Sequence, residues 1–188
     1  MSEPAIAGWA VLMSAWLAWA YPFIFLAPHV QKRPSITLAG PTRAGLVLEC
    51  LGIFVAFACR SQGGEPVSWW RLAGTVVCGA IAAVLAWTAV RHLGRQFRVN
   101  AGLYEDHELV TTGPYAIVRH PIYASLLAIL ASTLFLLTPW TWAVLSLALF
   151  IAGTEIRVGA EDGLLASRFG AAFAEYKSRV KAYIPLVR

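Results

Sequence analysis

Residues 122–154 read IYASLLAILASTLFLLTPWTWAVLSLALFIAGT, two apolar runs without a charged residue that are separated only by Thr138-Pro139. A helix needs roughly 17 to 25 predominantly apolar residues to span a bilayer. Residues 122–137 and 140–154 are candidates for such helices. The short break between them predicts a tight helical hairpin.

Three further apolar runs precede this hairpin, at residues 5–27, 44–59 and 72–90. Of the 188 residues, 59% are hydrophobic and only 13% are charged, and a soluble domain would carry more charge. The sequence therefore predicts an all-α integral membrane protein with five transmembrane helices in one domain, residues 1–188. Pro22 interrupts the first run, which no Lys or Arg precedes, so we expect a retained helix rather than a signal peptide.

The basic residues lie in the connections between these runs and indicate how the helices are oriented. Cytoplasmic connections of membrane proteins carry an excess of Lys and Arg. With the N-terminus outside, thirteen of the fifteen Lys and Arg are cytoplasmic, and only Arg60 and Arg71 are not. The C-terminus and any active site are then predicted to be cytoplasmic. Four tryptophans would gather at the outer boundary, where indole rings prefer to lie: Trp69, Trp70, Trp140 and Trp142.

Two sizeable polar segments share the predicted cytoplasmic face, residues 91–121 and the tail after Thr154. Apolar residues recur in the tail near the helical period, at Leu165, Phe169, Phe173, Tyr176 and Val180. This pattern predicts a cytoplasmic amphipathic C-terminal helix. Such a helix lies at the membrane interface, and it can also act as a lid over a site.

Several functional classes do not fit this sequence. The net charge is +5, but the basic residues are not interleaved with stacking aromatics, so nucleic-acid binding is not expected. Cys50, Cys59 and Cys78 lie inside apolar runs without a metal-ligand spacing, which predicts packing roles and no metal site. A glycine-rich phosphate loop between a strand and a helix is missing, which argues against a Rossmann-type site.

The first group of candidate site residues is Arg119-His120-Pro121, where the fourth apolar run begins. Ionisable groups against hydrocarbon are costly, so such a cluster suggests a site. Proline suits the first turn of a helix, and a helix N-terminus beside a guanidinium suits a carboxylate. The alternative is that Arg119 only reaches toward lipid phosphates.

The second group is Glu161-Asp162 at the start of the tail helix, where acidic side chains stabilise the first turn. Arg157 precedes Glu161 by four residues, so the two can pair on one helix face. The carboxylates either form such surface contacts or recognise a ligand. Glu49 lies inside the second apolar run, where a carboxylate is usually paired or faces a cavity, and its role stays open.

These segments together resemble a known family. HELVTTGPY at residues 107–115, followed by VRHPIY at 118–123, resembles the first signature of the isoprenylcysteine carboxyl methyltransferase family. EDGLLASRFGAAFAEY at residues 161–176, followed by YIP at 183–185, is similar to the second. The resemblance covers about residues 93–185. It departs from the usual pattern at three positions: Asp162 stands for Glu, Phe173 for Tyr and Ser125 for Gly.

The resemblance implies a membrane methyltransferase that uses S-adenosyl-L-methionine without a Rossmann domain. The residues that would contact the cofactor are His107, Leu109, Val110, Gly113, Pro114, Tyr115, His120, Tyr123, Glu161 and Asp162. The catalytic residues would be Arg119, Arg157 and Glu161. One of the two arginines would hold the acceptor carboxylate. Residues 93–188 would form the cofactor-binding and catalytic half, and residues 1–92 would give access to the substrate.

The expected reaction is methyl transfer to an amphiphilic acceptor at the cytoplasmic face, with a prenylcysteine-like carboxylate as the favoured nucleophile. The expected partners are the bilayer and a lipophilic or prenylated acceptor, with no metal and no nucleic acid. One alternative is N-methylation of a phospholipid amine, which needs a base to remove a proton. A second is an NADPH-dependent membrane reductase, although Pro121-Ile122-Tyr123 departs from the Pro-Asn-Tyr motif of those enzymes.

Overall fold

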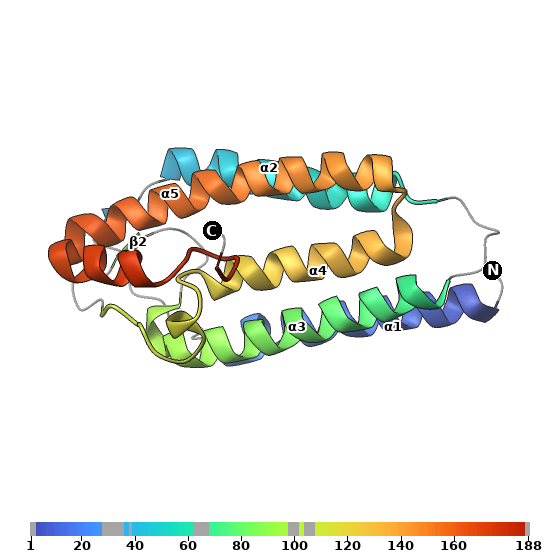
Figure 1. Cartoon of the computed structure of the whole chain (residues 1–188), viewed down its shortest axis with the longest axis horizontal. Helices are drawn as coiled ribbons and strands as arrows, with labels where there is room; N and C mark the ends of the chain where they lie inside the picture. The colour runs from blue at the N-terminus through green and yellow to red at the C-terminus, as the bar shows by residue number, and fades with distance from the viewer. Residues whose placement is uncertain are drawn as a thin grey trace.

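The computed structural model describes residues 3–27, 36–37, 39–61, 68–97, 102–103 and 108–186, and these form a bundle of long helices (Figure 1). The long helices are α1 (Glu3–Tyr21), α2 (Ala39–Ala58), α3 (Trp69–Leu93), α4 (Pro121–Leu137) and α5 (Trp140–Arg179). The shorter elements are the π-helical turn η1 (Pro22–Leu26), the 3₁₀ turns η2 (Gly94–Gln96) and η3 (Gly113–Ala116), and the strands β1 (Ile36–Thr37) and β2 (Gly102–Leu103). The all-α prediction is confirmed for the described residues, apart from the short antiparallel pairing of β1 with β2.

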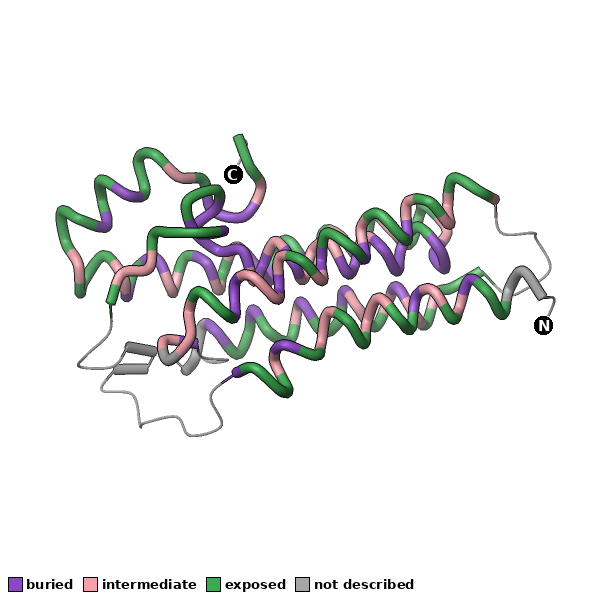
Figure 2. Tube along the Cα trace, turned by 90° about the horizontal axis from the view of Figure 1, so that it is seen from below, coloured by how far each residue is buried: buried purple, intermediate pink, exposed green. Residues whose placement is uncertain are grey.

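The helices lie at the five predicted apolar runs. Among the described residues, three stretches are long and apolar enough to cross a membrane: Ile6–Leu26, Trp69–Leu93 and Trp140–Arg179. α4 is a shorter apolar helix of 17 residues. Buried residues face the inside of the bundle and exposed ones face outward (Figure 2). Many outward residues are large and apolar, among them Leu17, Phe54 and Val84, as expected of a surface in contact with lipid.

Small residues let α2 and α5 approach each other closely. A Cβ atom built on Gly153 of α5 would lie 2.4 Å from the carbonyl oxygen of Gly45 in α2. One built on Gly52 would lie 2.7 Å from the carbonyl oxygen of Ser146, whose own Oγ donates a 2.8 Å hydrogen bond to the Gly52 carbonyl. Small residues of this kind are typical of helix contacts in membranes. They bring the backbones of α2 and α5 together beside Glu49 and Arg157.

Hydroxyl groups join the other helices. Ser132 Oγ of α4 donates to the carbonyl of Thr75 in α3 at 2.8 Å, and Thr75 Oγ1 donates to the Ser132 carbonyl at 3.2 Å. Trp16 Nε1 of α1 donates to Thr133 Oγ1 of α4 at 3.1 Å. The three hydroxyl-bearing side chains are fully buried. These bonds satisfy polar groups in an apolar interior and fix how α1, α3 and α4 face one another.

α5 differs from the predicted pair of a short fifth span and a separate tail helix. It is one helix of 40 residues, and its only non-helical backbone is at Gly170, with φ +50° and ψ −120°. Residues 155–169 contain no proline, so the helix continues past Thr154. Gly170 adopts the positive φ easily, and the last turns of α5 fold back toward the bundle (Figure 1). The apolar pattern predicted for the tail, from Leu165 to Val180, therefore spans the break at Gly170. Phe173 and Tyr176, which follow the break, are buried.

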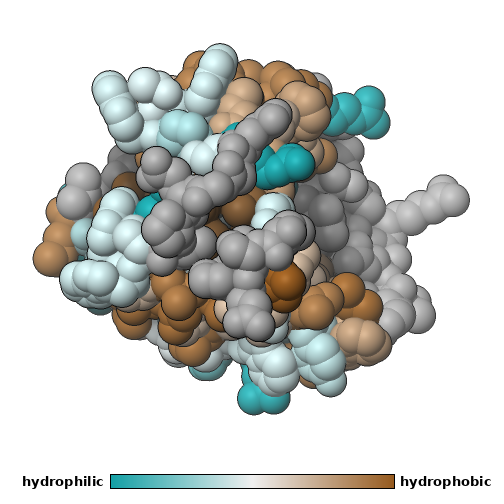
Figure 3. Space-filling model, turned by 90° about the vertical axis from the view of Figure 1, so that its right-hand side faces the viewer, coloured by the Kyte–Doolittle hydropathy of each residue, from teal (hydrophilic) through white to brown (hydrophobic). Residues whose placement is uncertain are grey.

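The two ends of the bundle differ in polarity. α3 and α5 both begin at the end on the right of Figure 1, where the predicted tryptophan group lies at Trp69, Trp70, Trp140 and Trp142. Seen from that end, the described surface is mostly pale or brown, with few strongly hydrophilic side chains (Figure 3). The first turn of α4, η3 and the second half of α5 lie at the opposite end. Both sequence signatures therefore meet at one end of the molecule.

Candidate active site

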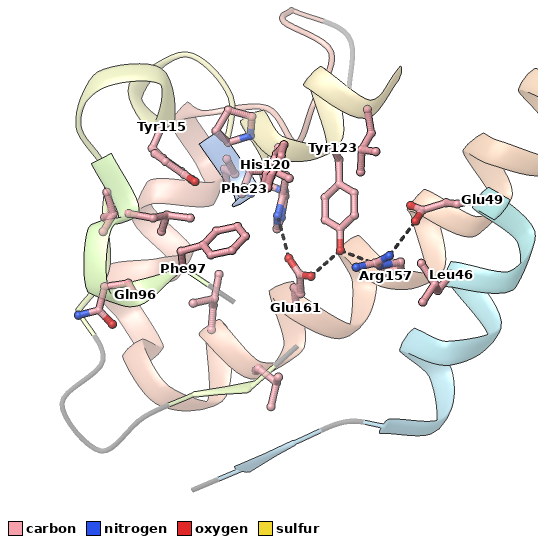
Figure 4. Close-up of a pocket in the computed structure, with 18 of the residues that line it drawn as sticks. Phe23, Leu46, Glu49, Gln96, Phe97, Tyr115, His120, Tyr123, Arg157 and Glu161 are labelled. Carbon is pink, nitrogen blue, oxygen red and sulfur yellow. Dashed lines mark hydrogen bonds and ion pairs between the residues drawn. The ribbon is translucent and has the colours of Figure 1, made fainter. Parts of the chain in front are cut away.

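A cavity of about 550 Å³ lies at the end of the bundle where the two signatures meet (Figure 4). Its volume falls in the range of small-molecule and cofactor sites. One part is lined by charged and hydroxyl-bearing side chains from α2, α4 and α5. The other part is apolar, and it is lined by residues from α1, η1, α2, α4 and α5: Trp19, Phe23, Leu46, Ile53, Leu126 and Phe150. The site is therefore amphiphilic.

A continuous series of polar contacts runs along the charged wall of the cavity. Tyr123 Oη donates to Glu161 Oε1 at 2.5 Å and accepts from Arg157 Nε at 2.9 Å. Arg157 Nη1 in turn donates to Glu49 Oε2 at 2.8 Å, and Thr154 Oγ1 donates to Glu49 Oε1 at 3.0 Å. The expected association of Arg157 with Glu161 is thus made through Tyr123 Oη. Glu49, whose role the sequence left open, is the buried partner of Arg157.

His120 lies between the two carboxylates of the second signature. Its Nε2 is 2.9 Å from Asp162 Oδ1, and its Nδ1 is 3.4 Å from Glu161 Oε2. Burial lowers the pKa of His120, but the hydrogen bonds and negative charges of Asp162 and Glu161 outweigh that effect and raise it above the usual value. The two carboxylates therefore stabilise the protonated form of the ring, which can donate from both nitrogens.

Asp162 and Arg119 connect the site to the C-terminal segment. Asp162 accepts hydrogen bonds from Arg119 Nη2 at 2.9 Å and His120 Nε2 at 2.9 Å, and it pairs with Lys177 Nζ at 3.0 Å. Arg119 Nη1 also donates to the carbonyl of Val180. The backbone N–H groups of Arg119 and His120 donate to carbonyls of residues 181 and 182 at 2.8 and 2.7 Å. This network holds the end of the chain against the start of α4.

Tyr115 Oη and Arg119 Nε are buried polar atoms without a hydrogen-bond partner within the described part of the chain, and both residues line the cavity. Burial raises the pKa of Tyr115 well above its ordinary value, so the phenol keeps its proton. Buried polar groups are normally paired, so these atoms suit hydrogen bonds to a ligand.

Most of the sequence-predicted site residues lie together. Those that line the cavity are Leu109, Val110, Tyr115, Arg119, His120, Tyr123, Arg157 and Glu161. Asp162 lies behind His120, and Pro114 lines a second, apolar cavity. Gly113 has φ +60°, and a Cβ there would lie 2.2 Å from His92 Nε2, which explains the glycine in the turn. His107 lies outside the described residues.

Several lining residues were not predicted as site residues. Glu49 gave a signal, as a lone carboxylate in an apolar run, but its partner is more than a hundred residues away in the sequence. Trp19 and Phe23 line the cavity but have no sequence pattern that separates them from other aromatics of the first span. Their position depends on how α1 packs against α4.

The apolar helices indicate an integral membrane protein, and its cavity has a lining that is partly charged and partly apolar. Residues 74–167 match the family described as the isoprenylcysteine carboxyl methyltransferase (ICMT) family, half of this chain. The chain belongs to this family of methyltransferases, which confirms the resemblance seen in the sequence.

Named relatives agree with the family match. The chain is 30% identical over 128 residues to the protein-S-isoprenylcysteine O-methyltransferase of Tribolium castaneum, covering 66% of this chain and 45% of that protein. It is 30% identical over 144 residues to protein-S-isoprenylcysteine O-methyltransferase B of Arabidopsis thaliana, covering 75% of this chain and 70% of that protein. It is also 26% identical over 169 residues to the nickel-cobalt-cadmium resistance protein NccN of Alcaligenes xylosoxydans xylosoxydans, covering 84% of this chain and 74% of that protein. This chain thus spans less than half the length of the Tribolium protein.

Proposed function

We propose that this chain transfers a methyl group from S-adenosyl-L-methionine to an amphiphilic acceptor, and that the nucleophile is the carboxylate of a prenylcysteine-like molecule. The observation that carries the proposal is one cavity that joins the charged wall to an apolar arm, the part lined by Trp19, Phe23, Leu46, Ile53, Leu126 and Phe150. A polar cofactor arrives from water and a lipophilic acceptor arrives from the bilayer. The distribution of Lys and Arg favours the cytoplasmic side for this meeting.

The residues at the charged wall fit the cofactor. Tyr115 Oη and Arg119 Nε are buried, face the cavity and lack a hydrogen-bond partner among the described residues, so they suit oxygen atoms of a ligand. Glu161 presents a partly exposed carboxylate that suits hydroxyl or ammonium groups. Bound S-adenosyl-L-methionine would supply an electrophilic methyl group on a sulfonium. Residues 108–110, Tyr115, His120, Tyr123 and Glu161 would bind and orient it.

Of the two candidate arginines, Arg157 is better placed to hold the acceptor carboxylate. Arg119 is engaged by Asp162 and by the carbonyl of Val180, which suits a role in holding the C-terminal segment. Arg157 lies beside Leu46 of the apolar arm (Figure 4), and Glu49 and Tyr123 fix its orientation. A guanidinium presents its donors in a planar fork whose geometry matches a carboxylate.

The position of His120 between two carboxylates favours a carboxylate over an amine as the acceptor. A carboxylate is already nucleophilic at neutral pH, whereas a phospholipid ammonium must first lose a proton to a base. His120 lies between Asp162 and Glu161, which stabilise its protonated form and make it less suited to that task. The remaining work of the protein is to align the reacting atoms and to exclude water.

The direct test is transfer of a labelled methyl group by the purified chain. The relative NccN carries a metal-resistance name, so similarity to this family does not by itself determine the acceptor. The acceptors compared are a prenylcysteine analogue, an ethanolamine phospholipid and a small thiol. We expect methylation of the prenylcysteine analogue alone. Methylation of the phospholipid instead would overturn the proposed acceptor, and no transfer to any acceptor would overturn the proposed activity.

The two arginines are compared in the same assay. Arg157→Lys keeps the charge but loses the planar arrangement of donors, and we expect the KM for the acceptor to rise about tenfold or more. Affinity for S-adenosylhomocysteine should stay within about twofold, because Arg157 is not assigned to the cofactor. An acceptor KM that rises in Arg119→Lys and not in Arg157→Lys would reverse the assignment.

A further inference from the structure

Ser125 anchors a tryptophan from the first helix at the cavity. Its side chain is fully buried in α4, where Oγ donates to the carbonyl of Ile122 at 2.7 Å and accepts from Trp19 Nε1 at 3.1 Å. Ser125 is one of the three positions at which the sequence departs from the pattern it resembles, which has glycine there. A glycine would leave the indole N–H without this acceptor. The departure in the sequence thus has a specific consequence for Trp19.

Trp19 is held on its other sides by aromatic contacts. Its ring lies edge-on to Trp16 at 5.4 Å between centroids and packs against Phe23 at 5.0 Å. Aromatic pairs at these separations add stability beyond the area they bury. Two ring contacts and one hydrogen bond therefore fix the orientation of the indole.

Trp19 also lies where the apolar arm ends. On each helix, the lining residue farthest from the site end of the bundle is Trp19 on α1, Ile53 on α2, Leu126 on α4 and Phe150 on α5. Trp16 lies about one helical turn farther from the site, packs against Phe57 at 6.0 Å and does not line the cavity. The Trp19 indole is therefore part of the floor of the arm.

We infer that Trp19, oriented by Ser125, is a specificity-determining residue that limits the length of the apolar group of the acceptor. This inference rests on the proposed function, because it assumes that the acceptor tail occupies the arm. Removing the indole opens space at the floor, which a longer chain fills and a shorter chain leaves empty. The preference among acceptors then shifts toward longer chains.

The experiment uses N-acetylcysteines with S-linked chains of two, three or four isoprene units, and it measures kcat/KM for each. In Trp19→Ala, we expect the ratio of the longest to the shortest acceptor to rise about tenfold or more, since single methylenes already change such ratios by that order. Ser125→Gly should shift the ratio in the same direction by less, because the indole is only loosened. An unchanged ratio in Trp19→Ala would overturn the inference.

The chain offers a matched control in Thr133→Ala. This change removes the hydroxyl that accepts from Trp16 Nε1 at 3.1 Å, the same kind of bond between the same two helices, at a residue that does not line the cavity. We expect the acceptor ratio to match the wild type. An equal shift in Thr133→Ala and Ser125→Gly would mean that general loosening of α1 is responsible, and it would also overturn the inference.

Binding of the three acceptors is measured in parallel by their thermal stabilisation of each variant in detergent. Retained affinity for S-adenosylhomocysteine identifies variants that fold. If no acceptor is methylated, the proposed function fails while this binding measurement still decides the inference. A shift of binding toward longer chains in Trp19→Ala supports it. The wild-type preference in Trp19→Ala, or no binding of any acceptor, overturns it.

Discussion

At the scale of single residues, Glu49 shows how the charged wall is kept in order. Its carboxylate is buried and pairs with Arg157, whose side chain is also largely buried. Burying such a pair is costly, and removing one partner is costlier, because the other charge is left without compensation. Glu49 therefore does more than fill the space between α2 and α5. It fixes the guanidinium that we assign to the acceptor.

We predict that Glu49→Ala destabilises the protein by about 3 kcal/mol, because it leaves the Arg157 charge buried and unbalanced. Glu49→Gln should retain a hydrogen bond to Thr154 and raise the KM for the acceptor without changing cofactor affinity. The measurements are thermal unfolding in detergent and acceptor kinetics. Glu175→Ala is the control, since its ion pair with Arg179 is exposed and such pairs contribute little. Equal losses in Glu49→Ala and Glu175→Ala would contradict the prediction.

His120 gives a prediction about pH. Its pKa in the folded protein is raised above 6.5 by Asp162 and Glu161, despite the opposing effect of burial. A group with a raised folded-state pKa contributes stability below its unfolded pKa, and this contribution is lost as the pH rises through the folded value. The stability advantage of wild type over His120→Asn should therefore be largest near pH 6 and shrink toward alkaline pH. Melting temperatures across this range test it, and a gap that widens with pH would refute it.

At the scale of elements, the helix boundaries show what the sequence could predict. Hydropathy predicted the bounds of α4 to within one residue, because Pro121 and Thr138 mark the two ends of the apolar run. α5 was predicted too short, because residues 155–169 continue the helix with a polar composition that resembles a separate tail. The partner of Glu49 was not predictable, because it depends on how α2 packs against α5. The local sequence pattern predicts the helices, whereas the contact between Glu49 and Arg157 depends on the packing of distant helices.

The close crossing of α2 and α5 gives a prediction about glycine. In Gly153→Ala the new Cβ would lie 2.4 Å from the Gly45 carbonyl oxygen, so the two backbones must separate. We expect a loss of about 1–3 kcal/mol, the usual cost of overpacking, together with weaker acceptor binding as Glu49 moves away from Arg157. Gly159→Ala in the same helix has open space around its Cβ, so it should be neutral or stabilising. Similar melting temperatures in the two variants would argue against a tight crossing.

At the scale of the whole molecule, the long helices alternate in direction. The start of α4 and the second half of α5, which carry charged residues of the site, therefore lie at the same end of the bundle (Figure 1). The other end carries exposed tryptophans and few strongly hydrophilic side chains (Figure 3). An enzyme that joins a water-soluble cofactor to a lipophilic acceptor needs this polarity, because the reactants come from different phases. The orientation of the bundle then decides which aqueous compartment supplies the cofactor.

The orientation is tested by labelling single cysteines from one side of the membrane. In a variant with Cys50, Cys59 and Cys78 replaced by Ala, we place one cysteine at Trp140 or at Arg179, both exposed and at opposite ends of α5. The excess of Lys and Arg at the site end predicts that this end is cytoplasmic. A membrane-impermeant thiol reagent should therefore label Trp140→Cys in intact cells and Arg179→Cys only in inverted vesicles. The reverse pattern would place the site on the outer face, where an intracellular cofactor could not reach it, and the proposed reaction would fail with the topology.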